Sequence, residues 1–161
     1  MTDNQIDLTD LFPRSTFDPE APAPRIAVLG TGYLGATHAV AMAQLGMEVV
    51  GVDTDPNKVA MLTAGKVPFY EPGLPELLTE QLATGRLRFT TDVAEAVGWA
   101  DVHFVCVGTP QQKGRLAADT SYVEAVVEGL APHLRPGALV VGKSTVPGRR
   151  CGASPSTTAS T

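Results

Sequence analysis

The residues best suited to chemistry form a glycine-rich string near the start of the chain. Residues 30–35 have the G-x-G-x-x-G spacing and read Gly30, Thr31, Gly32, Tyr33, Leu34 and Gly35. After a strand, Gly30 would permit a tight turn, Gly32 the close approach of a pyrophosphate, and Gly35 close packing of helix on strand. The string alone is weak evidence, because the same glycines can serve a strand-to-helix turn that binds nothing.

A carboxylate further along the chain strengthens the interpretation as a dinucleotide site. Asp53 follows the expected strand 48–52, where it could accept hydrogen bonds from an adenosine ribose and repel the 2′-phosphate of NADP. Residues 54–57 contain no arginine, so NAD is the favoured cofactor. Lys58 lies one helical turn beyond and could reach the adenosine, or it could be an ordinary solvated lysine.

Two threonines follow later apolar runs in the same way. Thr109 comes two positions after the run 102–107, and Thr145 follows the run 138–141 by a few positions. Ligands of open α/β sheets bind beyond the carboxyl ends of the strands. Thr109 could therefore offer its hydroxyl and backbone groups to the cofactor, with a plain loop turn as the alternative. Thr145 is expected near the nicotinamide.

These residues need a framework of alternating strands and helices, and the hydrophobic pattern predicts one. Strands are expected at residues 26–29, 48–52, 87–90, 102–107 and 138–141. Helices are expected at 34–45, 55–64, 75–83, a short segment opened by Asp92, and 121–134. This alternation predicts an α/β fold, a doubly wound and mostly parallel Rossmann sheet with helices on both faces.

Length and composition fit one domain with two tails. The chain has 161 residues, 43% of them hydrophobic, a mean hydropathy of +0.06 and a formal net charge of −5. We predict a dinucleotide-binding domain over residues 25–147 and a disordered tail over 148–161. Residues 1–24 are acidic and rich in proline, and we expect a disordered leader, with an interaction tail as the alternative.

Composition also argues against several classes of function. The chain has no basic stripe and a pI near 5.1, so we expect no nucleic-acid partner. No apolar run approaches the roughly 20 residues of a membrane helix, and we expect a cytoplasmic protein with no membrane contact. Cys106 and Cys151 have no metal-ligand spacing, and no metal site is predicted. His103 and Cys106 are interpreted as core residues.

Six segments in order resemble the UDP-glucose/GDP-mannose dehydrogenase family. They read RIAVLGTGYLG, EVVGVDTDPNKV, YEPGLPELL, GRLRFTTD, VGTP and VGKSTVP. The resemblance covers the N-terminal domain of that family and implies an NAD cofactor. It implies NAD contacts at the glycine turn, Tyr33, Leu34, Asp53, Lys58 and Thr109, and it places Thr145 at the active-site edge beside the nicotinamide.

The resemblance also implies a reaction. Such enzymes oxidise the C6 alcohol of a nucleotide sugar to a carboxylate in two hydride transfers to NAD, with a cysteine holding the intermediate. The resemblance is strongest to members that act on UDP-glucose; GDP-mannose and UDP-N-acetyl-hexosamines are the alternative substrates. The six segments argue against another Rossmann dehydrogenase, such as a 3-hydroxyacid enzyme.

The catalytic cysteine, the dimerisation helix of the homo-oligomeric enzymes and the C-terminal domain belong to later parts of family chains. We therefore expect this chain alone to form no UDP-glucuronate, with a non-catalytic NAD-binding fragment as the alternative description. After Pro147 the family pattern ends abruptly in the sequence GRRCG. A shifted reading frame is our hypothesis for this change, and a gene with no alternative frame continuing the family would contradict it.

Overall fold

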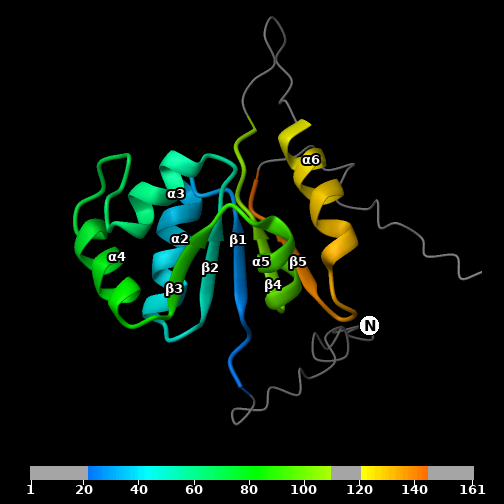
Figure 1. Cartoon of the computed structure of the whole chain (residues 1–161), viewed down its shortest axis with the longest axis horizontal. Helices are drawn as coiled ribbons and strands as arrows, with labels where there is room; N and C mark the ends of the chain where they lie inside the picture. The colour runs from blue at the N-terminus through cyan, green and yellow to red at the C-terminus, as the bar shows by residue number, and fades with distance from the viewer. Residues whose placement is uncertain (1–21, 110–120, 145–161) are drawn as a thin grey trace, which may run out of the picture.

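The computed structural model describes residues 22–109 and 121–144, and these form one parallel sheet with helices on both faces (Figure 1). The five strands stand in the order β3-β2-β1-β4-β5, which confirms the predicted doubly wound Rossmann sheet. They are β1 (Ile26–Leu29), β2 (Val49–Val52), β3 (Leu87–Thr90), β4 (Val102–Val105) and β5 (Leu139–Gly142).

The order in which successive strands join the sheet changes side at β1: β2 and β3 lie on one side of it, and β4 and β5 on the other. Ile26 of β1 pairs with Val49 of β2 on one side and with Val102 of β4 on the other. Every residue of β1 and β2 is buried, as expected for short apolar strands covered by helices. Because β1 pairs with β2 on one side and with β4 on the other, the switch point in strand order lies between β1 and β4. In open α/β sheets a crevice forms at such a point.

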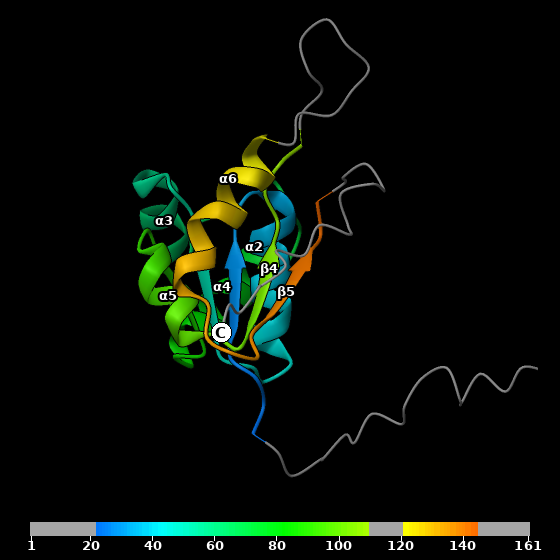
Figure 2. The same cartoon turned by 90° about the vertical axis from the view of Figure 1, so that its right-hand side faces the viewer.

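The helices form two layers, one on each face of the sheet (Figures 1 and 2). They are α2 (Tyr33–Gln44), α3 (Pro56–Thr63), α4 (Leu74–Ala83), α5 (Val93–Trp99) and α6 (Ser121–Leu130). One core cluster joins α2, α3 and α4 to the sheet, and a second joins α5 and α6 to its opposite face. Both faces of the central strands are buried as a result.

Aspartates begin two of the helices, as their positions in the sequence predict. Asp55 caps α3 by accepting hydrogen bonds from the backbone N–H groups of Asn57 and Lys58. Asp92 caps α5 by accepting a hydrogen bond from the backbone N–H of Glu95. Such caps satisfy amide donors that have no partner within the helix. Both helices therefore begin at fixed positions beside the carboxyl edge of the sheet.

The structure differs from the predicted elements by more than one residue in two places. The strand expected at 102–107 ends at Val105, and its alternate residues Val102 and Phe104 are only half-buried. The helix expected at 121–134 ends at Leu130 and continues as the 3-10 turn Ala131–His133. Pro132 lacks a backbone N–H and cannot extend the α-helical hydrogen bonding, which accounts for the earlier end.

Candidate dinucleotide-binding site

The turn between β1 and α2 can form only with glycine at two of its positions. Gly30 has φ +92°, and a Cβ there would lie 2.9 Å from Cγ1 of Val107. A Cβ on Gly35 would lie 1.8 Å from the carbonyl oxygen of Gly30. The first glycine thus allows the backbone turn, and the third lets α2 start directly against that turn.

Gly32 stands in a different environment from the two other glycines. A Cβ placed on it would meet nothing within 4 Å, so open space adjoins the backbone here. Gly32 is the N-cap of α2, and no side chain of the described residues caps this helix. The first amide groups of α2 are therefore available at the positive end of the helix, an arrangement suited to an anionic group such as a pyrophosphate.

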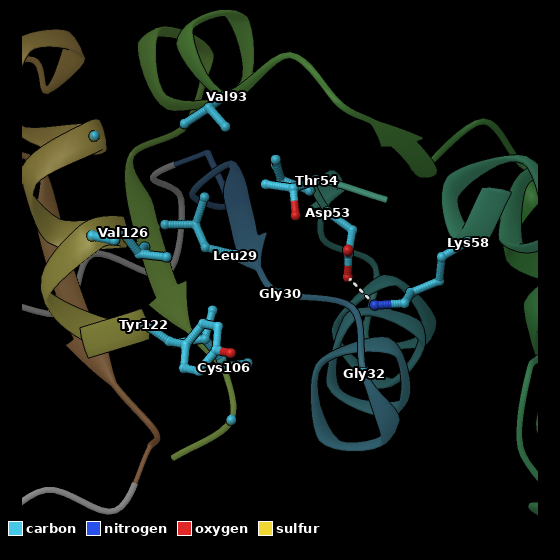
Figure 3. Close-up of a pocket in the computed structure, with 15 residues that line it drawn as sticks. Leu29, Gly30, Gly32, Asp53, Thr54, Lys58, Val93, Cys106, Tyr122 and Val126 are labelled. Atoms are coloured by element: carbon cyan, nitrogen blue, oxygen red, sulfur yellow. Dashed lines mark hydrogen bonds and ion pairs between the residues drawn. The ribbon is translucent and has the colours of Figure 1, made fainter. Parts of the chain in front are cut away.

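A cavity of about 430 Å³ lies beyond the carboxyl ends of β1, β2 and β4 (Figure 3). Asp53 and Lys58 stand on one side of it, and Tyr122 and Val126 of α6 stand on the other. Its walls are mostly apolar, with polar groups gathered near Asp53. The full lining consists of Leu29, Gly30, Gly32, Val52, Asp53, Thr54, Lys58, Val93, Cys106, Val107, Gly108, Tyr122, Ala125, Val126 and Gly129.

Asp53 has an ordered set of hydrogen-bond donors around it. Its Oδ2 accepts from the backbone N–H of Thr31 at 2.9 Å and from the Thr31 hydroxyl at 3.0 Å. The Nζ of Lys58 donates to the same oxygen at 2.8 Å. Oδ1 accepts from the backbone N–H of Asp55 at 3.1 Å. Each carboxylate oxygen has about two lone-pair sites, so Oδ1, which accepts one hydrogen bond, retains capacity for a ligand donor.

These donors keep the Asp53 carboxylate ionised. Burial raises the pKa of Asp53, but the hydrogen bonds from Lys58, Thr31 and Asp55 outweigh this effect. The pKa therefore lies below its ordinary value. An ionised acceptor at the end of β2 favours a ligand that donates hydroxyl groups and disfavours one that carries a phosphate there.

Two of the sequence-predicted residues at the start of α2 lie outside the cavity lining. Tyr33 and Leu34 are 56% and 46% exposed. The Tyr33 hydroxyl donates a hydrogen bond to Glu71, and its ring packs edge-on against Phe69 at 5.1 Å between centroids. This hydrogen bond and the charge of Glu71 raise the pKa of Tyr33. The side chain thus joins α2 to the loop before α4, and only its backbone amide belongs to the turn.

The remaining predicted residues fall at the end of the described segments. Thr109 is half-buried just past Gly108 and is not part of the lining. Thr145 lies outside the described residues. The structure therefore brings together Gly30, Gly32, Asp53 and Lys58 at the cavity, with Thr31 behind Asp53 and Gly35 behind Gly30.

Sequence reasoning did not identify the α6 side of the cavity. Tyr122, Val126 and Gly129 recur at helical spacing and line the cavity together, yet the same spacing also describes an ordinary core face. Cys106 was expected in the core; it is 7% exposed and also lines the cavity. Burial raises the pKa of its thiol, which Lys143 partly offsets, so a nucleophilic role is disfavoured.

The described residues contain no group of His, Cys, Asp and Glu side chains that could hold a metal ion. None of the helices they form has both the length and the apolar character needed to cross a bilayer. Buried His103 has its ring nitrogens 3.1 Å from the carbonyl oxygen of Val97 and 3.3 Å from that of Leu139. It therefore connects α5 and β5 away from the cavity.

Residues 24–157 match the model of the UDP-glucose/GDP-mannose dehydrogenase family, NAD binding domain. A UDP-glucose 6-dehydrogenase of Rhizobium meliloti is 44% identical over 123 residues, which are 76% of this chain and 28% of that protein. A GDP-mannose 6-dehydrogenase of Pseudomonas syringae is 43% identical over 129 residues, 77% of this chain and 29% of that protein.

Solved structures give the same result. A UDP-glucose dehydrogenase from Pyrobaculum islandicum superposes with a TM-score of 0.75 at 43% identity, over 81% of this chain and 31% of that one. A GDP-mannose dehydrogenase from Pseudomonas aeruginosa, solved as a ternary complex, gives a TM-score of 0.71 at 42% identity, over 76% of this chain and 28% of that one. The chain thus spans under a third of the length of these relatives.

Proposed function

The chain belongs to the UDP-glucose/GDP-mannose dehydrogenase family, and we propose that it is the NAD-binding part of a UDP-glucose 6-dehydrogenase. Such an enzyme oxidises UDP-glucose to UDP-glucuronate with two NAD. The matched part is the NAD-binding domain of a nucleotide-sugar dehydrogenase, and its cofactor is NAD. The observation that carries the NAD-binding part of the proposal is the ionised Asp53 carboxylate, which lies in the cavity beside the glycine turn.

The residues around the cavity fit each part of an NAD molecule. In our proposal the amides of Gly32, Tyr33 and Leu34 bind the pyrophosphate at the start of α2. Oδ1 of Asp53 accepts a hydrogen bond from the adenosine ribose, and Lys58, already paired with Oδ2, supplies positive charge beside it.

The rest of the cofactor is assigned by the position of the apolar wall. Val93 and the α6 residues Tyr122 and Val126 would hold the adenine, because flat apolar groups favour such walls. Thr109 and Thr145 would contact the nicotinamide. The residues of this domain would bind and orient NAD, which when bound would supply the hydride acceptor.

Calorimetric titration with NAD tests the site. We expect Asp53→Asn to weaken NAD binding about tenfold or more, because the neutral amide replaces a charge-assisted acceptor and places an NH2 group where one carboxylate oxygen stood. Glu80→Gln makes the same chemical change on the exposed face of α4 and should bind NAD as the unmodified chain does. Equal NAD affinity in the two variants, with both folded, would contradict the proposed role of Asp53.

The choice of sugar rests on the relatives. Proteins called UDP-glucose 6-dehydrogenase match at 40% to 45% identity, and GDP-mannose 6-dehydrogenases match over a similar range. GDP-mannose is therefore the second candidate. Adding each nucleotide sugar to an enzyme that contains this domain, and following NADH absorbance, distinguishes them. NADH formation with GDP-mannose but not with UDP-glucose would replace our assignment.

Three broader assignments belong to the same proposal. We place the domain boundary at residues 25–147, and we expect a full-length cytoplasmic homo-oligomer without nucleic-acid partners. Limited proteolysis that leaves a stable product with these ends would support the boundary. Cell fractionation and size-exclusion chromatography of the full-length enzyme test its location and assembly.

A further inference from the structure

The two oxygens of the Asp53 carboxylate have different surroundings. Oδ2 accepts three hydrogen bonds, two from Thr31 and one from Lys58, while Oδ1 accepts one from the backbone of Asp55. Thr31 is therefore the largest source of hydrogen bonds to this carboxylate. The oxygen that Thr31 holds has little capacity left for a ligand, and the other oxygen keeps some.

Thr31 acts on Asp53 from behind the site. The residue is 0% exposed and is not part of the cavity lining. Its methyl group also fits against β2, since a Cβ on Gly51 would lie 3.0 Å from Cγ2 of Thr31. A buried side chain with one hydroxyl partner and one packed methyl has a fixed rotamer, so its hydroxyl direction is fixed as well.

We propose that Thr31 is a positioning residue for cofactor choice: its backbone N–H and buried hydroxyl hold Oδ2 of Asp53, so that Oδ1 is kept in place for the ribose hydroxyls of NAD. The proposal rests on the proposed function, because it concerns the same site. Without the hydroxyl, Asp53 retains its charge but gains rotational freedom. Its hydrogen bond to NAD then weakens, and its repulsion of a 2′-phosphate weakens with it.

Thr31→Val tests the hydroxyl alone, because valine keeps the branched shape and the methyl group that lies against β2. We expect Thr31→Val to weaken NAD binding about three- to tenfold, the range for one lost hydrogen bond acting indirectly. NADP, measured by competition against NAD, should lose less affinity or gain some. The ratio of NAD to NADP affinity should therefore fall at least about threefold. Thr31→Ser, which keeps the hydroxyl, should restore the ratio.

Thr79→Val is the matched control. Its hydroxyl donates to the backbone oxygen of Pro75 within α4, on the exposed surface and away from the cavity. Both cofactor affinities should be unchanged in this variant. If Thr31→Val does not fold, the comparison of Thr31→Ser with Thr31→Ala isolates the same hydroxyl, because both variants lack the methyl group.

The outcomes separate a positioning role from a structural one. A general loosening of the domain would weaken NAD and NADP by the same factor, and that result would overturn the proposal. So would a Thr31→Val chain that binds both cofactors as the unmodified chain does. If the unmodified, folded chain does not bind NAD, the proposed function is refuted as well. This result is distinguishable from failure of the Thr31 proposal alone, because NAD binding by the unmodified chain is measured first.

Discussion

Single atoms decide whether the turn at residues 30–35 can form, and Gly35 has the tightest surroundings. A Cβ there would overlap the carbonyl oxygen of Gly30 at 1.8 Å, so Gly35→Ala must displace α2 from β1. We expect a loss of about 3 kcal/mol in the free energy of unfolding, measured by urea denaturation.

Gly98→Ala is the control, because a Cβ on this α5 residue meets nothing within 4 Å. Alanine should be neutral or stabilising there, and equal effects of the two substitutions would contradict the packing argument.

Asp101, which directly precedes β4 at the amino ends of the strands, makes the free energy of unfolding depend on pH. A side-chain hydrogen bond from Arg25 is the largest cause that holds the pKa of Asp101 at about 2, below its ordinary 3.8, and Arg135 adds to it. A lowered pKa stabilises the fold above pH 3.8, and this contribution is lost as pH falls toward 2. Asp101→Asn should therefore lower the free energy of unfolding by about 1 kcal/mol or less at pH 7. The difference from the unmodified chain should shrink as pH falls through about 2 and vanish below it, and a difference independent of pH would exclude this ion pair as its source.

Among the elements, α5 depends most directly on its cap. The Asp92 side chain accepts a hydrogen bond from the Glu95 N–H at 2.9 Å, and the helix has only seven residues. Asp92→Ala should lower the free energy of unfolding by about 1 kcal/mol, as for other N-cap losses, measured by thermal denaturation. Asp92→Asn retains an acceptor and should recover most of it. Because Val93 of α5 lines the cavity, NAD affinity should also fall in Asp92→Ala. An unchanged free energy of unfolding in Asp92→Ala would show that packing alone holds α5 in place.

The elements themselves could be predicted from the sequence because their signals are local. Apolar runs, Asp55 and Asp92 at helix starts, and the glycine spacing each lie within a few neighbouring residues. The contents of the cavity depend on contacts between distant residues. The sequence left open whether Lys58 is solvated, and the structure brings its Nζ to Asp53. The hydrogen bond from the Thr31 hydroxyl could not be predicted, because it depends on how β1 and β2 are aligned.

At the scale of the whole molecule, the sheet is unevenly protected from solvent. The residues of β1 and β2 are buried, whereas β5 lies at the sheet edge with Leu139 and Val140 55% and 38% exposed. Elements with few buried contacts open more easily than the centre of a core. The site lies mainly on the protected strands, since its glycine turn and Asp53 follow β1 and β2.

Hydrogen exchange should reveal this gradient. Amides of β1 and β2 should exchange slowest and those of β5 fastest, because β5 is an exposed edge strand that pairs with β4 alone. Adding NAD should slow exchange most at residues 30–34 and 53–58, where the proposed contacts lie, and in α6 across the cavity. A ligand that merely stabilised the whole fold would slow the globally exchanging amides of every strand by a common factor. Protection by NAD centred on β5 and absent from residues 30–34 would place the cofactor outside the cavity described, and would contradict the proposed site.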